Sequence, residues 1–310
     1  LTAYNNGDYG VYAFDAVDGV LDHSYASGSP DAGFYIGQCY PCDAIVNNVI
    51  SENNGLGYSG TNSGGSLYII SSVFKNNKGG LAPNTLDSEL LPPERETFII
   101  GNLIENNNNI DAPATQSTNL SLGNGVVIAG GNNNVIKNNV IANHNLYGVI
   151  ITATADVNYW PAHGNRVESN LIINSKRADI ASSGLSNLGN CFENNYFNTS
   201  IPPGLQTLNN CDSSFYPLSA DLSGMWSSLA RVIQTSDGNY SQGDWRTFEA
   251  PANQPNMPIM DELMSLGYDK TSLPVTKIWS SVKPAVEVFS QYEDVLEVIE
   301  LPEEARNYLN

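Results

Sequence analysis

Two long insertions carry most of the side chains that could do chemistry. Residues 82–97 include Asp87, Glu89, Glu94, Arg95 and Glu96, and residues 152–164 include Asp156, Tyr159, Trp160 and His163. Glycoside hydrolysis needs two carboxyl groups roughly 5 to 9.5 Å apart, and an exposed aromatic ring can support the sugar. On that chemistry the candidate catalytic acids are Glu94 and Asp156. The candidate ligand-binding residues are Tyr159 and Trp160, whose rings could support the sugar, together with Arg166.

The same residues offer a second chemistry, that of a polysaccharide lyase or epimerase. His163 would be the base, and Arg95 or Arg166 would stabilise the enolate-like intermediate. A third interpretation is structural. In it, residues 94–96 form a solvated loop tip, His163 caps a turn and Trp160 packs its loop against the body of the protein. The residues alone leave all three interpretations open.

Charge narrows the range of partners. The chain has 310 residues, and 13 Lys and Arg stand against 32 Asp and Glu, for a formal net charge of -19. Such a field repels nucleic acid and anionic membrane surfaces, and it disfavours polyuronates unless calcium bridges them. No apolar run is long enough to cross a membrane. We therefore expect neither nucleic-acid binding nor membrane insertion.

Acidic insertions are also typical of calcium sites, but the expected motifs are missing. Neither an Asp-x-Asp-x-Asp loop nor a Gly-Gly-x-Gly-x-Asp repeat is present. We expect no metal site and no cofactor, and calcium is the one alternative that the acidic loops keep open.

The elements that must position these insertions follow a repeat. Two polar residues, often Asn-Asn, precede two apolar residues at least six times along the chain. The second polar positions are Asn48, Ser72, Asn102, Asn139, Asn170 and Asn195. Their spacing of about 24 to 37 residues is typical of a solenoid.

Each repeat holds three short runs that look like strands. One run follows a glycine, as at residues 33–36 and 125–128, and the other two flank the Asn pair. Stacked in parallel, such coils enclose a common core, and recurrent Asn side chains form hydrogen-bonded ladders. Residues 20–25 align with residues 45–50, which places Asp22 and His23 in the wall rather than in a catalytic site.

One segment carries a resemblance to known proteins. Residues 29–38 read Ser-Pro-Asp-Ala-Gly-Phe-Tyr-Ile-Gly-Gln. This resembles a Ser-x-Asp-Ala-Gly-Ile-Tyr-Val-Gly-Gln signature of exported bacterial β-helix repeat proteins of unassigned function. Residues 5 to about 200 resemble the pectate-lyase-like superfamily, which implies an all-β fold: a right-handed, single-stranded parallel β-helix with three strands per coil.

The resemblance implies a fold and no particular chemistry. The superfamily contains lyases, hydrolases, epimerases, adhesins and surface scaffolds. The Asp-Pro-His-Asp motif of β-helix mannuronan epimerases is absent from this chain, and the Arg and Lys base pattern of pectate lyases has no counterpart in it. No catalytic residue of either family is therefore carried over.

The four cysteines form two local pairs, Cys39 with Cys42 and Cys191 with Cys211. We expect two disulfides, although the Cys-x-x-Cys spacing is also that of a redox motif or half of a metal site. Disulfides persist outside the cytosol. The expected location is therefore extracellular, periplasmic or at the cell surface.

The pattern changes after Cys211, so we divide the chain at that point. Residues 1–211 are predicted to form the β-helix. Residues 212–310 are predicted to be an irregular, partly helical extension that caps the helix or lies along its side, because the open strand edges of a solenoid need a cover. A partner-docking arm is the alternative.

Two function classes follow. The preferred one is a non-catalytic surface solenoid that binds a glycan or an envelope protein. The alternative is a secreted carbohydrate-active enzyme that works in a groove between the two insertions, which would lie one coil apart on the same corner. A further insertion at residues 107–124 is expected to leave from another corner and to contribute Asp111 at most.

Overall fold

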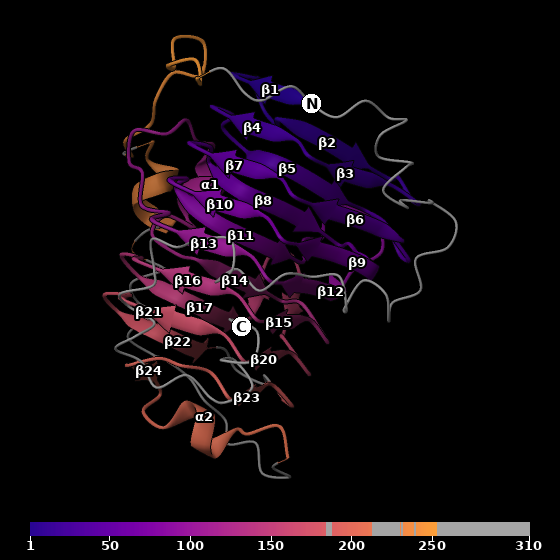
Figure 1. Ribbon diagram of the computed structural model, residues 1–310, viewed down its shortest axis with the longest axis vertical. Helices are drawn as coiled ribbons and strands as arrows, with labels where there is room; N and C mark the ends of the chain where they lie inside the picture. Colours follow the sequence, from indigo (N-terminus) through magenta and orange to yellow (C-terminus); the bar gives the residue numbers. More distant parts are fainter. Residues whose placement is uncertain (184–187, 213–229, 231, 239, 253–310) are drawn as a thin grey trace, which may run out of the picture.

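The chain folds into a right-handed parallel β-helix in which each coil contributes one strand to each of three parallel sheets (Figure 1). This confirms the predicted fold class. The computed structural model describes residues 1–183, 188–212, 230, 232–238 and 240–252.

The first sheet contains the strands that follow the Asn pairs. Its order is β1-β4-β7-β10-β13-β16-β21. The bounds are β1 (Thr2–Tyr4), β4 (Tyr25–Ser27), β7 (Ile50–Glu52), β10 (Val73–Lys75), β13 (Leu103–Glu105), β16 (Val140–Ala142) and β21 (Leu171–Ile173).

The second sheet contains the strands that follow a turn near a glycine. Its order is β2-β5-β8-β11-β14-β17-β22-β24. The bounds are β2 (Val11–Phe14), β5 (Ala32–Gly37), β8 (Leu56–Thr61), β11 (Gly79–Asn84), β14 (Val126–Ala129), β17 (Tyr147–Thr152), β22 (Ala178–Ser183) and β24 (Ser200–Ile201).

The third sheet contains the strands that precede the Asn pairs. The order of its strands is β23-β20-β15-β12-β9-β6-β3. The bounds are β3 (Val20–Asp22), β6 (Ala44–Asn47), β9 (Gly64–Ile70), β12 (Arg95–Ile100), β15 (Val135–Lys137), β20 (Arg166–Glu168) and β23 (Cys191–Glu193). The remaining elements are the antiparallel hairpin β18 (Thr154–Ala155) and β19 (Tyr159–Trp160), and the helices α1 (Gln116–Asn119) and α2 (Leu205–Leu208).

One continuous apolar core fills the space between the sheets. In the second sheet every other side chain points inward, and in register these are Phe34, Tyr58, Leu81, Val126, Val149 and Ile180. All six are fully buried. Their alternates point outward, so the outer face of this sheet is free to form a site.

Asparagine ladders run up the turns, as predicted. Asn102 donates through Nδ2 to Asn139 Oδ1 at 3.0 Å, and Asn139 donates in the same way to Asn170 Oδ1 at 2.9 Å. The series continues to Asn195 and ends on Gln206 of α2. These side chains are buried, so each bond satisfies polar atoms that water cannot reach.

One ladder position was predicted wrongly. Asn48 is the left-handed turn residue of its coil, with φ of 51°, and the strand register aligns it with Ser71 rather than Ser72. Val49 holds the ladder place instead, where its N–H donates to Ser72 Oγ at 3.1 Å. Asn48 occurs here because asparagine tolerates the left-handed backbone conformation, and not because its side chain takes part in a ladder.

The Asp22–His23 dipeptide lies in the wall. The pairing of β3 with β6 places Asp22 beside Asn47, which confirms the alignment of residues 20–25 with 45–50. Asn47 Nδ2 donates to Asp22 Oδ1 at 2.9 Å, and His23 takes the left-handed turn conformation with φ of 43°.

Both predicted disulfides are present, Cys39–Cys42 and Cys191–Cys211. Among the described residues, no helix is both long enough and apolar enough to span a membrane.

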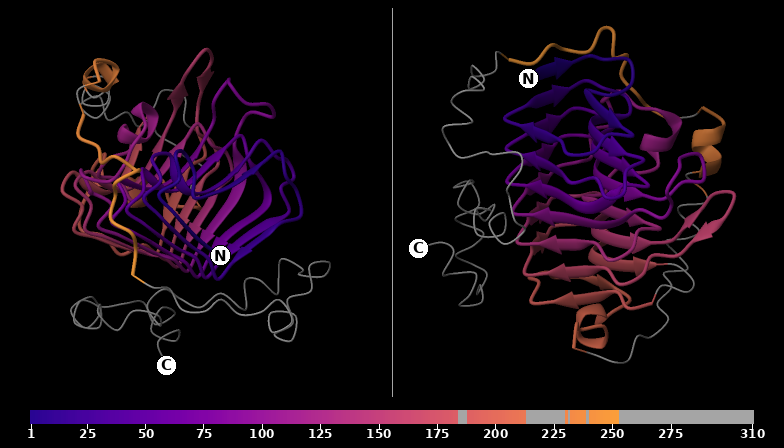
Figure 2. Two further views of the ribbon diagram at one scale, coloured as in Figure 1. Left: turned by 90° about the horizontal axis from the view of Figure 1, so that it is seen from above. Right: turned by 90° about the vertical axis from the view of Figure 1, so that its right-hand side faces the viewer.

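Residues 240–252 run along the stack toward its N-terminal coil (Figure 2). Lys78 Nζ donates to Ser241 O at 2.6 Å, and Asn5 Nδ2 donates to Phe248 O at 2.7 Å. Residues 213–229 and 253–310 lie outside the described residues. The division at residue 211 and the capping role of residues 212–310 therefore stay predictions.

Candidate functional site

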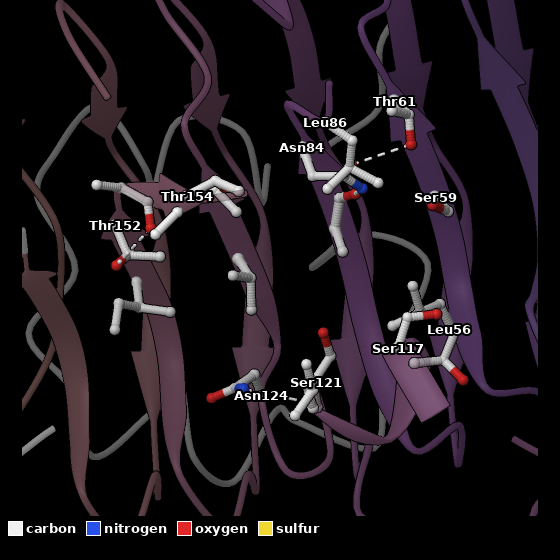
Figure 3. Close-up of a pocket in the computed structure, with 18 of the residues that line it drawn as sticks. Leu56, Ser59, Thr61, Asn84, Leu86, Ser117, Ser121, Asn124, Thr152 and Thr154 are labelled. Atoms are coloured by element: carbon white, nitrogen blue, oxygen red, sulfur yellow. Dashed lines mark hydrogen bonds between the residues drawn. The ribbon is translucent and has the colours of Figure 1, made fainter. Parts of the chain in front are cut away.

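A cavity of about 700 Å³ lies on the outer face of the second sheet (Figure 3). Its floor consists of outward-facing strand residues, namely Ser59 and Thr61 of β8, Ala82 and Asn84 of β11, Val127 and Ala129 of β14, and Ile150 and Thr152 of β17. Parallel strands lie about 4.8 Å apart, so the floor from Ser59 on β8 to Ser183 on β22 crosses five neighbouring strands and spans roughly 19 Å. The cavity therefore follows the stack of coils.

The two predicted insertions meet and form one wall of this cavity. Asp87 N donates to Asp156 Oδ2 at 2.9 Å, and Asp87 accepts bonds from Asn158 N at 2.7 Å and from Trp160 Nε1 at 3.2 Å. The bonds from Asn158 lower the pKa of the Asp87 carboxyl. The insertions thus lie on the same corner, as predicted, but they are joined to each other. The expectation of a groove between them is corrected, because the groove lies beside them.

The opposite wall comes from the insertion at residues 107–124. Thr115 caps α1, and Thr118 Oγ1 donates to Pro30 O at 2.9 Å, which anchors the helix to the coil. Side chains from residues 117–124 line the cavity. Viewed along the stack, α1 and the β18–β19 hairpin project from the same face on opposite sides of it (Figure 2). The expectation that this insertion contributes Asp111 at most was wrong.

Three carboxyl groups gather at the N-terminal end of the cavity. Asp31 and Glu89 line it, and Asp8 lies beside them, where its carbonyl accepts a bond from Asp31 N at 2.9 Å. Tyr35 donates its hydroxyl to Glu89 Oε1 at 2.6 Å. These groups come from three different coils, and their proximity depends on the stacking.

Tyrosine rings pack among the carboxyl groups. The ring centroids of Tyr9 and Tyr12 are 4.6 Å apart, those of Tyr12 and Tyr35 are 4.8 Å apart, and those of Tyr9 and Tyr35 are 4.9 Å apart. Tyr12 is 52% exposed, so one member of the group presents its ring to solvent.

The electrostatics of this end favour uncharged acids. Burial, and next the Asp8 carboxylate, raise the pKa of Asp31 to about 7. Burial also raises the pKa of Glu89, although the bond from Tyr35 opposes it. Within the described part of the chain, none of these carboxyl groups pairs with Lys or Arg. The raised values therefore reflect missing positive charge as well as burial.

One buried polar atom at this end, Glu89 Oε2, has no hydrogen-bond partner among the described residues. The Ser59 hydroxyl, next to Tyr35 in register, also lines the cavity. Buried polar groups normally find partners, so an unfilled acceptor in a cavity points to a ligand.

Glu94 does not lie on a groove wall. It is fully buried, where Oε1 accepts from Thr97 Oγ1 at 2.8 Å and Oε2 accepts from Asn134 Nδ2 at 2.8 Å. Asn134 begins the ladder that continues to Asn165 and Asn190. Glu94 is therefore a buried structural residue of the β-helix. This corrects two expectations, that Glu94 is a catalytic acid in the groove and that it lies at a solvated loop tip.

The candidate cations and the candidate base do not gather. The Arg95 guanidinium lies 3.5 Å from the Tyr40 ring centroid, and Arg166 pairs with Glu168 at 3.0 Å on the third sheet. His163 Nδ1 accepts a bond from Leu188 N at 3.0 Å. None of these three side chains lines the cavity.

The candidate rings divide between two roles. Tyr159 lines the cavity and is 48% exposed, so it is available to a ligand. Trp160 is half-buried and its Nε1–H is used on Asp87. Asp156 is exposed and accepts its bond from the neighbouring insertion.

In the described part of the chain, no group of three or more His, Cys, Asp or Glu side chains is placed to hold a metal ion. Calcium therefore has no candidate site in that part of the chain.

Comparison with known proteins adds a likeness in fold. No protein-family model and no curated protein matches the sequence. Among solved structures, the A-module of mannuronan C-5 epimerase AlgE4 from Azotobacter vinelandii is similar, with a TM-score of 0.39 and 16% identity over 62% of this chain and 52% of that chain. The AlgE6 A-module from the same organism has a TM-score of 0.36 and 18% identity over 64% of this chain and 49% of that one. The chain spans about half the length of each, and no residue role is carried over.

Sequence reasoning missed the carboxyl groups at the N-terminal end. Glu89 was recognised as part of an acidic insertion, but Asp31 was read only as part of a strand-leading signature. The signal that could have found the site is the pair Tyr12 and Tyr35, which lie in register on neighbouring coils of the second sheet, with Tyr9 three residues before Tyr12.

Proposed function

We propose that this protein binds a glycan chain in the cavity on the outer face of the second sheet and acts as a non-catalytic binding scaffold. The observation that carries the proposal is the cavity itself. It follows the coils across β8, β11, β14 and β17, and a chain of sugars is the ligand that fits an extended trough of this kind.

The lining supports a carbohydrate rather than an apolar or anionic ligand. Hydroxyl and amide groups of Thr61, Asn84 and Thr152 alternate with small apolar side chains, and Tyr159 offers an aromatic face. Sugars present both hydroxyl groups and apolar ring faces, so this mixture suits them. Among the residues that line the cavity there is no Lys, Arg or His, and Asp31 and Glu89 supply negative charge. A polyuronate is therefore a poor match.

The wider setting belongs to the same proposal. Two disulfides and a polar surface rich in Asn, Ser and Thr suit a location outside the cytosol, namely extracellular, periplasmic or at the cell surface. The expected partner there is a polysaccharide, and an envelope protein is the alternative.

The test is calorimetric titration with neutral and acidic tetrasaccharides, using the full chain. Ala129 lies in the middle of the floor between Asn84 and Thr152, so Ala129→Trp fills the trough. We expect it to abolish binding of any tetrasaccharide that the wild type binds. Ala16→Trp, on an exposed turn, is the matched control and should leave binding unchanged. Equal binding by the wild type and Ala129→Trp would refute the site.

A carbohydrate-active enzyme is the second candidate, and one observation favours it. Asp31, whose pKa is raised to about 7, faces Glu89 and Asp8 at the end of the cavity, and carboxyl pairs of this kind serve as general acid and base in glycosidases. Incubation of a bound glycan with the protein, followed by assay of new reducing ends and of double bonds, separates the two candidates. Turnover that Asp31→Asn removes would establish the enzyme and refute the non-catalytic scaffold.

A further inference from the structure

We propose that the N-terminal end of the cavity, lined by Asp31, Glu89, Tyr9 and Ser59, is a subsite for a sugar that carries a protonated amine. This inference rests on the proposed glycan-binding function and names the chemical class of one residue of the bound chain.

Charge is the first ground for it. Asp31 and Glu89 line the cavity and Asp8 adjoins them, yet none of the three pairs with a basic side chain within the described residues. Carboxylates that are taken from water and crowded together are costly unless a cation or a proton joins them. In the free protein, a proton on Asp31 reduces the repulsion between these carboxylates. In the complex, an ammonium group on the ligand would neutralise them instead.

Hydrogen-bonding capacity is the second ground. An ammonium group brings three donors and no acceptor. Glu89 Oε2 is a buried acceptor without a partner among the described residues, and the Ser59 hydroxyl on the floor can accept a further hydrogen bond. The tyrosine hydroxyls nearby are already used, that of Tyr35 on Glu89 at 2.6 Å and that of Tyr9 on Asp31. An N-acetyl group carries no positive charge, and its carbonyl acceptor cannot bond to a carboxylate.

The rings are the third ground. Tyr9 lines the cavity and packs with Tyr12 and Tyr35, with ring centroids within 4.9 Å of one another, and the face of a tyrosine ring attracts a cation. A tyrosine face also suits the apolar side of a sugar ring. Tyrosine stays uncharged here, because burial raises the pKa of Tyr9 and of Tyr35 above the ordinary value.

Protonation gives the proposal a second observable. The titratable groups that face Asp31 are Asp8 and Tyr9 on the first coil, Tyr12 on β2, Tyr35 on β5 and Glu89 on the insertion. Burial and the Asp8 carboxylate raise the pKa of Asp31 to about 7, so Asp31 holds a proton at pH 6. A bound ammonium group would lower that pKa, and the proton would leave for the buffer. Binding should therefore release up to one proton per site at pH 6.

The experiment is calorimetric titration at pH 6 with a glucosamine tetrasaccharide, its N-acetylated counterpart and a galacturonate tetrasaccharide. Two buffers with different ionisation enthalpies give the number of protons released. We expect the amine form to bind roughly tenfold more tightly than the N-acetylated form, which is the size expected of a charge-assisted hydrogen bond. The galacturonate should bind most weakly.

Variants locate the preference. Asp31→Asn and Glu89→Gln should bring the affinity ratio of amine to N-acetyl close to one and should abolish proton release, while binding of the N-acetylated form persists. Asp15→Asn, which removes one carboxylate from an exposed left-handed turn, is the charge-matched control and should keep both effects.

Two outcomes would overturn the inference: equal affinity of the wild type for the amine and N-acetylated forms, or an amine preference that survives in both variants. Failure of the proposed function has a different signature. In that case none of the three tetrasaccharides binds, or Ala129→Trp binds them as the wild type does.

Discussion

Replacement of Glu94 by Gln should stabilise the protein, and the gain should grow with pH. Burial raises the pKa of Glu94 from 4.5 to about 8, against the opposing bonds from Thr97 and Asn134. The folded protein therefore holds a proton that the unfolded chain releases above pH 4.5. Since the folded state binds more protons across this interval, the free energy of unfolding falls as pH rises from 4.5 to 8.

The size of the stability change follows from the difference between the pKa of Glu94 in the unfolded chain and its pKa in the folded protein. Each pKa unit corresponds to about 1.36 kcal/mol, so Glu94 costs about 3 kcal/mol at pH 7, about 4 kcal/mol at pH 8 and about 5 kcal/mol at pH 9, relative to pH 4. Gln keeps the shape of the protonated acid. Its oxygen accepts from Asn134 Nδ2, and its amide donates to Thr97 Oγ1. Glu94→Gln should therefore match the wild type at pH 4 to 5 and exceed its stability by about 3 kcal/mol at pH 7.

The assay is urea unfolding followed by circular dichroism at pH 5, 7 and 9 for both proteins. Other groups also titrate in this range, including Lys78, whose pKa burial lowers to about 8. Their effects cancel in the difference between wild type and variant. Glu96→Gln is the control at a neighbouring position. In the wild type the Glu96 carboxyl accepts a bond from the exposed Tyr40 hydroxyl, so it is not buried as Glu94 is. A stability difference for Glu94→Gln that does not change between pH 5 and pH 9, or a loss of stability at pH 9, would refute the reasoning.

Three further predictions test the wall and the groove. Asn139→Ala removes four side-chain bonds of a buried ladder residue and should lower the free energy of unfolding by about 3 kcal/mol, measured by urea unfolding. Serine in place of Cys191 and Cys211 opens a loop whose ends are 20 residues apart, and it should cost roughly 3 kcal/mol in the same assay, with a smaller effect indicating residual structure in the unfolded chain. Asp87→Ala removes the acceptor that joins the two insertions, so hydrogen exchange at residues 154–160 should accelerate while the core strands stay protected.

The fold could be predicted because the repeat and the physics agree at each coil. A polar pair at a turn predicts both a left-handed residue and a ladder residue, and the structure has both at Gly101–Asn102, Asn138–Asn139 and Ser169–Asn170. Asn48 was misplaced because Asn suits either role. Only the strand register, which depends on the neighbouring coils, decides between them.

The candidate site was harder to predict, since its residues meet through stacking rather than through sequence. Asp31 and Glu89 are 58 positions apart, and nothing local marks them as neighbours. Glu94 shows the opposite failure. It sits among charged residues in a long insertion and looks exposed, yet the chain has already entered the wall one residue before β12. The row that it joins, Asn134, Asn165 and Asn190, is visible only once Thr97 is aligned with Asn134.

The distribution of positive charge explains why the groove is acidic. The protein has 13 basic side chains, and several of them are committed to the wall. Lys137 and Arg166 both pair with Glu168 on the third sheet, Arg95 covers Tyr40, and Lys78 is buried against backbone carbonyls. None of these four reaches the outer face of the second sheet, and within the described residues no basic side chain pairs with Asp31 or Glu89. Under our proposal, the unfilled acceptor Glu89 Oε2 and the acids without a basic partner favour a ligand that supplies donors and positive charge. We therefore expect an amine-bearing sugar to bind more tightly than a uronate.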